Sequence, residues 1–143
     1  MFRIVIVAAA LLLSAGEAFA HGSEAAAPPP PKQDASVVPI TLGQTKKGVV
    51  FTTTKGMTLY YFDRDNTGKT STCDGPCTDK WMPLSAPKDA QPFGDFTVIT
   101  RNDGSKMWAY RYRPLYTSDQ DKTPGDVNGF DPQNLWHIAR PVD

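Results

Sequence analysis

The residues best suited to chemistry are two cysteines four positions apart, Cys73 and Cys77. In an oxidising compartment such a pair is expected to form a disulfide, which here would close a short ring inside a loop. Thiol–disulfide exchange is the alternative. Against exchange, the spacing is not Cys-x-x-Cys, no βαβ pattern surrounds the pair, and no helix N-terminus is expected there to lower a thiol pKa.

Carboxylates recur at a spacing that could hold calcium. Asp63 and Asp65 open a segment that resembles the start of a calcium-binding loop, and Asp119 and Asp121 repeat the spacing. Thr67 stands where Asp or Asn is usual, and the Glu expected at the twelfth position is missing. The alternative is that these aspartates order their own loops by accepting backbone N–H bonds as Asx turns.

Soft ligands suggest a second kind of metal site. Met82, Met107 and His137 each lie next to a tryptophan, and thioether and imidazole groups suit Cu(I). The alternative is that the methionines fill gaps in a hydrophobic core. No spacing requires these three residues to converge. Copper and calcium are therefore both candidate cofactors. The simpler expectation is that the protein has no cofactor.

The sequence offers no constellation for catalysis. It contains neither a Gly-x-Ser-x-Gly motif nor a phosphate-binding glycine loop. Its aspartates fall in segments expected to be solvated loops, and no general base is indicated in an apolar pocket. We therefore expect no enzyme activity and assign no catalytic residue.

These residues belong to a stretch that occurs twice. Residues 59–65 and 115–121 share a leucine, a tyrosine and two aspartates at an offset of 56 positions. In a strand, Tyr60 and Phe62 point to the same face, which indicates an aromatic contribution to the core. We predict that Tyr60 and Tyr116 share one interior, while the acidic turns that follow them lie in water.

The elements that must position these residues are strands. Alternating and β-branched runs predict strands at residues 37–42, 48–54, 57–62, 96–100, 107–112, 115–117 and 135–139, and residues 81–84 form an apolar segment after the cysteine loop. Glycine-containing turns at 55–56 and 102–105 indicate hairpins, the first of them joining 48–54 to 57–62. No segment shows a sustained helical period. The predicted fold is all-β, with two pseudo-repeated β-hairpin units sharing an aromatic core and long loops rich in Asp, Gly and Pro.

The N-terminal residues indicate export. Residues 1–20 combine Arg3, an apolar run from 4 to 13 and the small-x-small end Ala18-Phe19-Ala20, as in a signal peptide cleaved near Ala20. The run is too short to span a membrane, and no cysteine follows it to carry a lipid. Residues 21–35 are predicted to be a Pro/Ala-rich disordered tether, and residues 36–143 one domain. The predicted location is periplasmic or secreted.

Charge and length narrow the class of partner. The chain has 15 basic and 15 acidic residues, and this balance argues against nucleic acid or an anionic membrane surface as the main partner. The acidic residues after position 20 are thirteen Asp and a single Glu, a composition typical of polar loops between strands. The length suits one small domain.

The repeated stretch resembles the signature of a known family. It is similar to the secreted-repeat lipoproteins, which carry a Tyr-x-(Phe/Trp/Tyr)-x-x-Asp motif. The motif residues are Tyr60, Phe62 and Asp65 in the first copy and Tyr116 and Asp121 in the second. Ser118 replaces the aromatic residue of the second copy, and the similarity runs from about residue 49 to residue 136. The resemblance implies the fold and a secreted location, but no reaction, because the family has no established activity.

Three functions follow from these observations as hypotheses. The first is a non-enzymatic periplasmic or secreted binding or interaction module that presents its Asp-rich loops to a periplasmic protein or small ligand. The second is a periplasmic metal-handling protein that binds copper through Met and His or calcium through Asp. The third is a thiol–disulfide accessory protein that uses Cys73 and Cys77.

Overall fold

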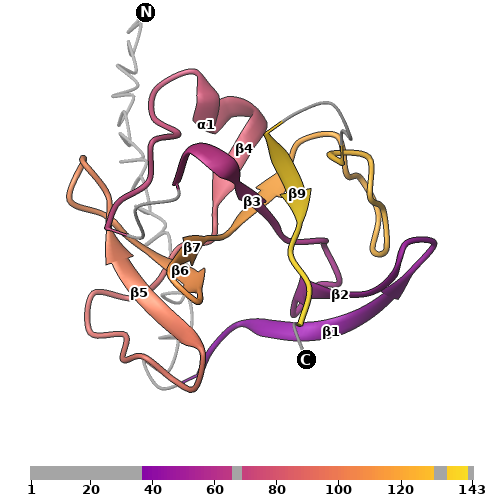
Figure 1. Cartoon of the computed structure of the whole chain (residues 1–143), viewed down its shortest axis with the longest axis horizontal. Coiled ribbons are helices and arrows are strands. Elements are labelled where there is room, and N and C mark those ends of the chain that lie inside the picture. The colour runs from indigo at the N-terminus through magenta and orange to yellow at the C-terminus, as the bar shows by residue number, and fades with distance from the viewer. Residues whose placement is uncertain (1–36, 66–68, 131–134, 142–143) are drawn as a thin grey trace, which may run out of the picture. The chain divides into compact units, whose positions relative to one another are not determined.

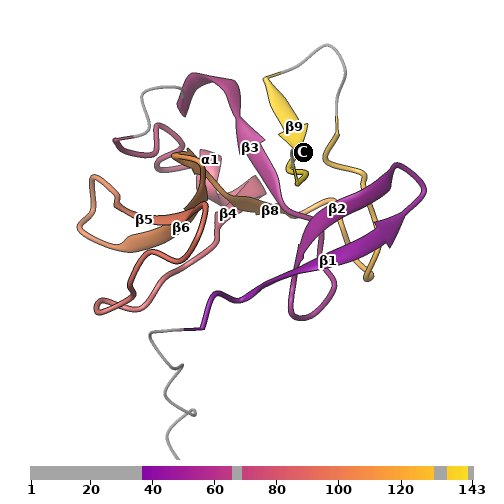
Figure 2. The ribbon, with the colours of Figure 1, turned by 60° about the horizontal axis from the view of Figure 1, so that its bottom comes forward.

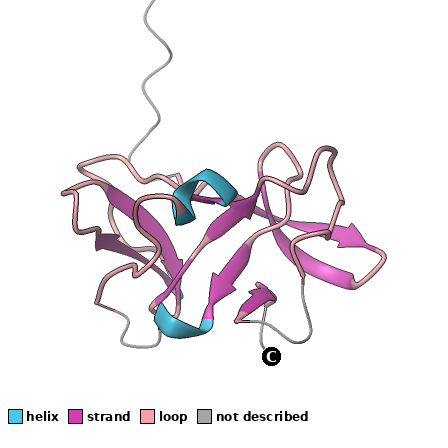
Figure 3. Cartoon of the chain, turned by 90° about the horizontal axis from the view of Figure 1, so that it is seen from above, coloured by secondary structure: helices cyan, strands magenta, loops and turns pink. Residues whose placement is uncertain are grey.

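The computed structural model describes residues 37–65, 69–130 and 135–141, and strands dominate this part of the chain. Its helical pieces are short: a 3-10 turn at Asp63–Asp65 (η1) and an α-helix at Cys77–Lys80 (α1) (Figure 3). The predicted all-β class is therefore confirmed. The predicted signal peptide and tether lie outside the described residues. Among those described, no helix has the length and apolar character needed to cross a membrane.

The centre of the domain is a four-stranded antiparallel sheet. Its strands lie in the order β4 (Trp81–Pro83), β8 (Tyr116–Ser118), β3 (Tyr60–Phe62) and β9 (Trp136–Ile138). β3 and β4 come from the first copy of the repeat, and β8 and β9 from the second. Each inner strand pairs with the outer strand of the other copy, so the two copies are intertwined rather than side by side.

Two hairpins flank this sheet, one from each copy, as Figure 1 and Figure 2 show. The first joins β1 (Ile40–Thr45) to β2 (Gly48–Thr53). The second joins β5 (Phe96–Thr100) to β6 (Lys106–Tyr110), and β6 also pairs with the short β7 (Arg113–Pro114). The two hairpins have matching turns, because Gly48 (φ 91°) and Gly104 (φ 83°) both adopt a positive φ that favours glycine.

The expected hairpin between residues 48–54 and 57–62 forms only near its turn. Thr52 and Thr58 make an isolated bridge, and the Leu59 N–H donates to the carbonyl of Phe51 at 2.9 Å. Beyond this point β2 pairs with β1, whereas β3 enters the central sheet. The prediction of one continuous hairpin was therefore wrong. A strand has only two edges, and both edges of β3 are taken by β8 and β9.

The interior is aromatic, as the repeat predicts. Trp81 and Trp136 stack with ring centroids 3.9 Å apart, and each makes an edge contact with the tyrosine of its own copy, Tyr60 or Tyr116. Full burial of each such ring contributes roughly 1.5–3 kcal/mol to the free energy of folding. A second apolar cluster joins the central sheet to β2; its buried members are Phe51, Leu59, Leu115 and Ala139.

Candidate functional site

Two buried tyrosine–aspartate pairs lie at the centre of the sheet. Tyr60 and Tyr116 are directly opposite each other on β3 and β8, and both are fully buried. The Tyr60 hydroxyl donates to Asp121 Oδ2 at 2.7 Å, and the Tyr116 hydroxyl donates to Asp65 Oδ2 at 2.6 Å. The pairs are reciprocal, because each tyrosine binds the aspartate of the other copy. Every motif tyrosine and aspartate therefore belongs to one structural centre.

The second oxygen of each aspartate holds a loop seven residues further along the chain. Asp65 Oδ1 accepts from the backbone N–H and the hydroxyl of Thr72, both at 2.7 Å. Asp121 Oδ1 accepts from the backbone N–H of Asn128 at 2.7 Å. Both carboxylates are thus fully engaged inside the protein, and each connects a tyrosine to a loop.

Burial and charge keep the two tyrosines protonated. Burial, followed by the hydrogen bond to Asp121, raises the pKa of Tyr60 well above its ordinary value. Burial and the hydrogen bond to Asp65 likewise raise the pKa of Tyr116, although the hydroxyl of Ser71, 2.7 Å away, opposes this. A tyrosine next to a carboxylate in a dry interior can donate its proton in a hydrogen bond but does not readily ionise.

The expectation that the acidic turns lie in water was wrong for the motif aspartates. Asp65 is 1% exposed and Asp121 is 6% exposed. Turn composition alone suggests solvated carboxylates, but a buried carboxylate is tolerated when its oxygens accept several hydrogen bonds. Asp63 and Asp119 differ: Asp63 is exposed, and Asp119 is partly exposed. These two loops consequently present fewer carboxylates to a partner than the sequence suggested.

The structure does not bring the candidate metal ligands into one group. Among the described residues, no three His, Cys, Asp or Glu side chains are close enough together to hold a metal ion. Met107 is fully buried in the core, whereas Met82 lies 38% exposed on β4. His137 Nε2 is hydrogen-bonded to Asp63 Oδ2 at 2.8 Å. Calcium or copper binding stays an untested prediction, with no site yet described for it.

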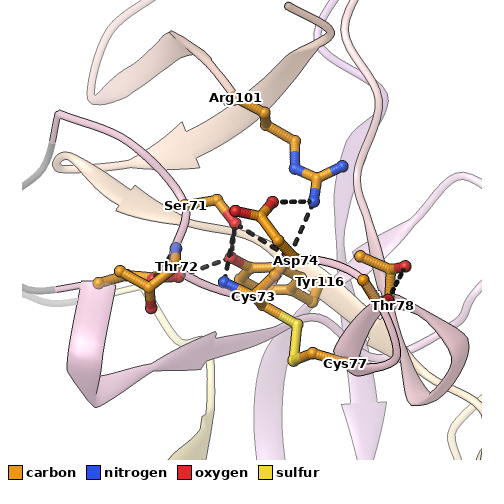
Figure 4. The surroundings of a disulfide bond; sticks show 10 residues. Ser71, Thr72, Cys73, Asp74, Cys77, Thr78, Arg101 and Tyr116 are labelled. Carbon is orange, nitrogen blue, oxygen red and sulfur yellow. Dashed lines mark hydrogen bonds and ion pairs between the residues drawn. A yellow bond between two sulfur atoms is a disulfide. The ribbon is translucent and has the colours of Figure 1, made fainter. Parts of the chain in front are cut away.

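The predicted disulfide between Cys73 and Cys77 is confirmed. Figure 4 shows the bridge beside Tyr116, with Arg101 reaching across from the end of β5. Arg101 donates from one terminal nitrogen to the carbonyl of Cys73 at 2.8 Å and to Asp74 at 2.9 Å. Cys73 is completely buried, so the loop is held by the bridge, by Arg101 and by the adjacent core together.

A cavity of about 450 Å³, which we call the arginine pocket, opens beside the central sheet. Its lining includes three buried apolar residues, Leu115, Ile138 and Ala139, which we call the base of the pocket. The remaining lining residues are aromatic or cationic: Tyr61, Tyr110, Arg111, Arg113 and Arg140. Pockets that hold small ligands span about 300–1,000 Å³ and combine apolar walls with a few polar groups, and this cavity fits that description.

Two of the three guanidinium groups lie over aromatic rings. Arg113 lies over the Tyr61 ring at 4.6 Å and Arg111 over the Tyr110 ring at 5.5 Å. Arg111 also pairs with Asp95 at 3.1 Å, while Arg113 makes no ion pair within the described residues. The pocket therefore carries more positive than negative charge, in a chain whose overall charge is balanced.

Sequence reasoning missed this pocket because its residues come from three separated segments. Tyr61 lies on β3, Arg111 and Arg113 flank the turn before β8, and Arg140 follows β9. None of them belongs to the repeated motif. An alignment of the two copies could have drawn attention to Arg113, because it is a charged residue at a position where the first copy has Met57.

Comparison with known proteins agrees with the internal symmetry. Neither the curated proteins nor the solved structures contain a match to this chain. The profile of a protein family described as a secreted repeat of unknown function matches twice, over residues 41–85 and 97–140. The two matches coincide with the two intertwined copies and together cover more than half of the chain. The chain therefore belongs to this family of secreted repeats, as its repeated Tyr and Asp residues suggested.

Proposed function

We propose that this protein is a non-enzymatic binding module, acting outside the cytoplasm, that holds an anionic ligand in the arginine pocket. The observation that carries the proposal is the position of Arg113. Its guanidinium lies over the Tyr61 ring, 4.6 Å from the ring centroid, and lines the cavity without a carboxylate partner among the described residues. A stacked guanidinium keeps its N–H edge available for a planar anion.

The neighbouring charges support an anion rather than a cation. Arg111 and Arg140 line the same pocket, whereas none of the lining residues that the structure describes carries a carboxylate. Asp95 balances Arg111 from outside the lining, and the Arg140 guanidinium bonds only weakly, at 3.4 Å, to the carbonyl of Val49. An anion at this place would meet two arginines, Arg113 and Arg140, that form no ion pair within the part of the chain that the structure describes.

The rest of the domain supports a binding role without catalysis. The polar groups of the tyrosine–aspartate centre are buried and bonded to one another. Both thiols are consumed in the disulfide. Binding sites are commonly built on loops held by such a rigid scaffold. Here Arg111 lies in the two-residue turn between β6 and β7, and Arg113 is the first residue of β7.

The test is a nuclear magnetic resonance titration of the purified protein with a panel of small anions, including inorganic phosphate, sulfate and organic carboxylates. We expect at least one class to shift the backbone amides of Leu115 and Ala139 in a saturable manner. Arg113→Met should abolish that response. Arg64→Met, which removes an exposed arginine outside the pocket, should leave it unchanged. No response at the pocket to any anion at millimolar concentration would refute the proposal.

A further inference from the structure

The two copies can be matched atom by atom through their backbone hydrogen bonds. The Leu84 N–H donates to the carbonyl of Leu115 at 2.9 Å, and the Ala139 N–H donates to the carbonyl of Leu59 at 2.8 Å. Leu59 and Leu115 are the same residue of the repeat. Ala139 therefore occupies in the second copy the place that Leu84 occupies in the first.

With this correspondence, the residues around the pocket can be compared with the equivalent residues of the other copy. Several interior residues are the same in both copies, namely the paired tyrosines, the motif aspartates and the tryptophans, although Phe62 of the first copy corresponds to Ser118 of the second. Four residues lining the pocket differ between the copies: Tyr61 corresponds to Thr117, Arg113 to Met57, Ala139 to Leu84 and Arg140 to Ser85. Leu115, which also lines the pocket, is the same residue as Leu59. At these positions the second copy supplies two cations and a methyl group in place of a leucine side chain, and the first copy supplies the aromatic ring of Tyr61.

The turn that carries the arginines is also strained in one copy only. Arg111 and Tyr112 both have a positive φ, 47° and 63°, although neither is glycine. In the first copy, Gly56 stands at the position of Tyr112 and adopts a similar positive φ of 81°. A left-handed conformation at two consecutive non-glycine residues is unfavourable, and such strain is concentrated at functional sites. Here it is tolerated at the turn between the two arginines of the pocket.

The lining specifies what kind of anion the pocket would hold. Five of its eight lining residues are apolar or aromatic, and the three at its base are almost completely buried. A small inorganic anion would leave this apolar base without a contact. A flat apolar group would instead fill the space beside the two tyrosines and contact the small part of Leu115, Ile138 and Ala139 that is still exposed.

We infer that the ligand is a small carboxylic acid with a flat, apolar body, such as an aromatic carboxylate; this inference rests on the proposed function of the pocket. The apolar body occupies the base next to Ala139. The carboxylate accepts hydrogen bonds from the N–H edge of Arg113, which its stacking on Tyr61 holds in place. A planar carboxylate matches the fork of a guanidinium better than a bare point charge does.

Three probes separate the parts of this inference: 2-naphthoate, the neutral 2-naphthalenemethanol and inorganic phosphate. Isothermal titration calorimetry on the purified protein should show that 2-naphthoate binds about tenfold or more tightly than the neutral alcohol, since hydrogen bonds to a charged group are the strong ones. Inorganic phosphate should not compete with 2-naphthoate.

Two substitutions borrowed from the first copy test the residues. Arg113→Met should weaken 2-naphthoate binding by about tenfold or more while leaving the neutral alcohol unaffected. Ala139→Leu should weaken both naphthalene probes by filling the base. Arg64→Met is the matched control and should change neither. Thermal melting of each variant confirms folding; Arg113 is exposed, so its substitution remains informative if Ala139→Leu unfolds the protein.

The possible failures are distinguishable. If phosphate binds at Arg113 and 2-naphthoate does not, the ligand class is wrong while the anion-binding function stands. If the alcohol binds as tightly as 2-naphthoate, or Arg113→Met retains full affinity, the charge recognition proposed for this pocket is wrong as well. If 2-naphthoate and phosphate both fail to bind, the ligand class is overturned, and the wider anion panel decides the proposed function.

Discussion

The Tyr60 hydroxyl of the first copy donates to the Asp121 carboxylate of the second across 2.7 Å, and 61 residues separate the two in sequence. The mirror pair, Tyr116 and Asp65, bridges 51 residues in the opposite sense. Each copy therefore supplies the acceptor that the tyrosine of the other copy needs. Each buried carboxylate receives one of its hydrogen bonds from the tyrosine of the other copy, so neither copy alone supplies all the donors that its carboxylate needs. The two copies therefore form one folded unit.

Replacing Tyr60 with phenylalanine should destabilise the protein by about 1–3 kcal/mol, because Asp121 would keep a buried oxygen without its donor. The backbone N–H of Gly129, 3.3 Å from the Tyr60 hydroxyl, would lose its acceptor as well. Urea denaturation followed by tryptophan fluorescence measures the change. Tyr112→Phe is the matched control, since Tyr112 is 65% exposed and its loss of a hydroxyl should be nearly neutral. Equal stability of the two variants would contradict the role given to the buried pair.

Asp65→Asn should cost about 1.5–3 kcal/mol or more, because three donors converge on this carboxylate and an amide nitrogen cannot accept from any of them. The amide keeps one acceptor oxygen, so either Tyr116 or Thr72 loses its acceptor, and loss on the Thr72 side should also loosen the loop that leads to Cys73. Hydrogen exchange of the Thr72 amide reports this local effect separately from global stability. The same change at exposed Asp89 serves as the control and should alter neither measurement.

Alkaline pH should destabilise the fold through the two buried tyrosines. Their folded-state pKa values are raised, so their stabilising contribution is complete below the ordinary tyrosine pKa of about 10 and declines as the pH rises above it. Once the unfolded chain ionises and the folded one does not, each tyrosine should reduce the free energy of unfolding by about 1.4 kcal/mol per pH unit.

Denaturation curves at pH 9, 10 and 11 test this, with tyrosinate absorbance recorded in parallel. Tyr116→Phe should have a shallower decline with pH than the unmodified protein, because one of the two groups is gone. A tyrosinate signal from Tyr60 or Tyr116 that rises before unfolding would show that these hydroxyls are not protected as described.

Removing the disulfide should weaken the fold only modestly. A ring closed by residues four positions apart constrains the unfolded chain by about 2 kcal/mol, and Arg101 still holds the loop at Cys73 and Asp74. The double variant Cys73→Ser, Cys77→Ser should remain folded with a melting temperature lowered by several degrees.

The same bridge separates a structural role from thiol exchange. Mass spectrometry after incubation in a glutathione buffer should find Cys73 and Cys77 still joined, since Cys73 is completely buried and cannot be attacked without local opening. Ready reduction under these conditions, with the fold intact, would favour the thiol–disulfide hypothesis instead.

The primary structure determined the composition of the interior and its two-fold plan. Tyr60 and Tyr116 follow the alternation of a strand, and alternation reports which face a side chain takes. The span of β5 was predicted without error because Phe96–Thr100 pairs with its immediate neighbour β6 across a short turn. The disulfide also followed from the sequence, since only one cysteine pair exists.

Tertiary structure alone decided which copy supplies each partner. Alternation does not say what lies across the sheet, so the exchange of Asp65 and Asp121 between copies, and their burial, could not be read from spacing. The arginine pocket also depends on how the strands pair. Tyr61, Arg113 and Arg140 come together because β3 lies between β8 and β9. Local patterns predict faces and turns, whereas contacts more than fifty residues apart depend on how whole strands pair.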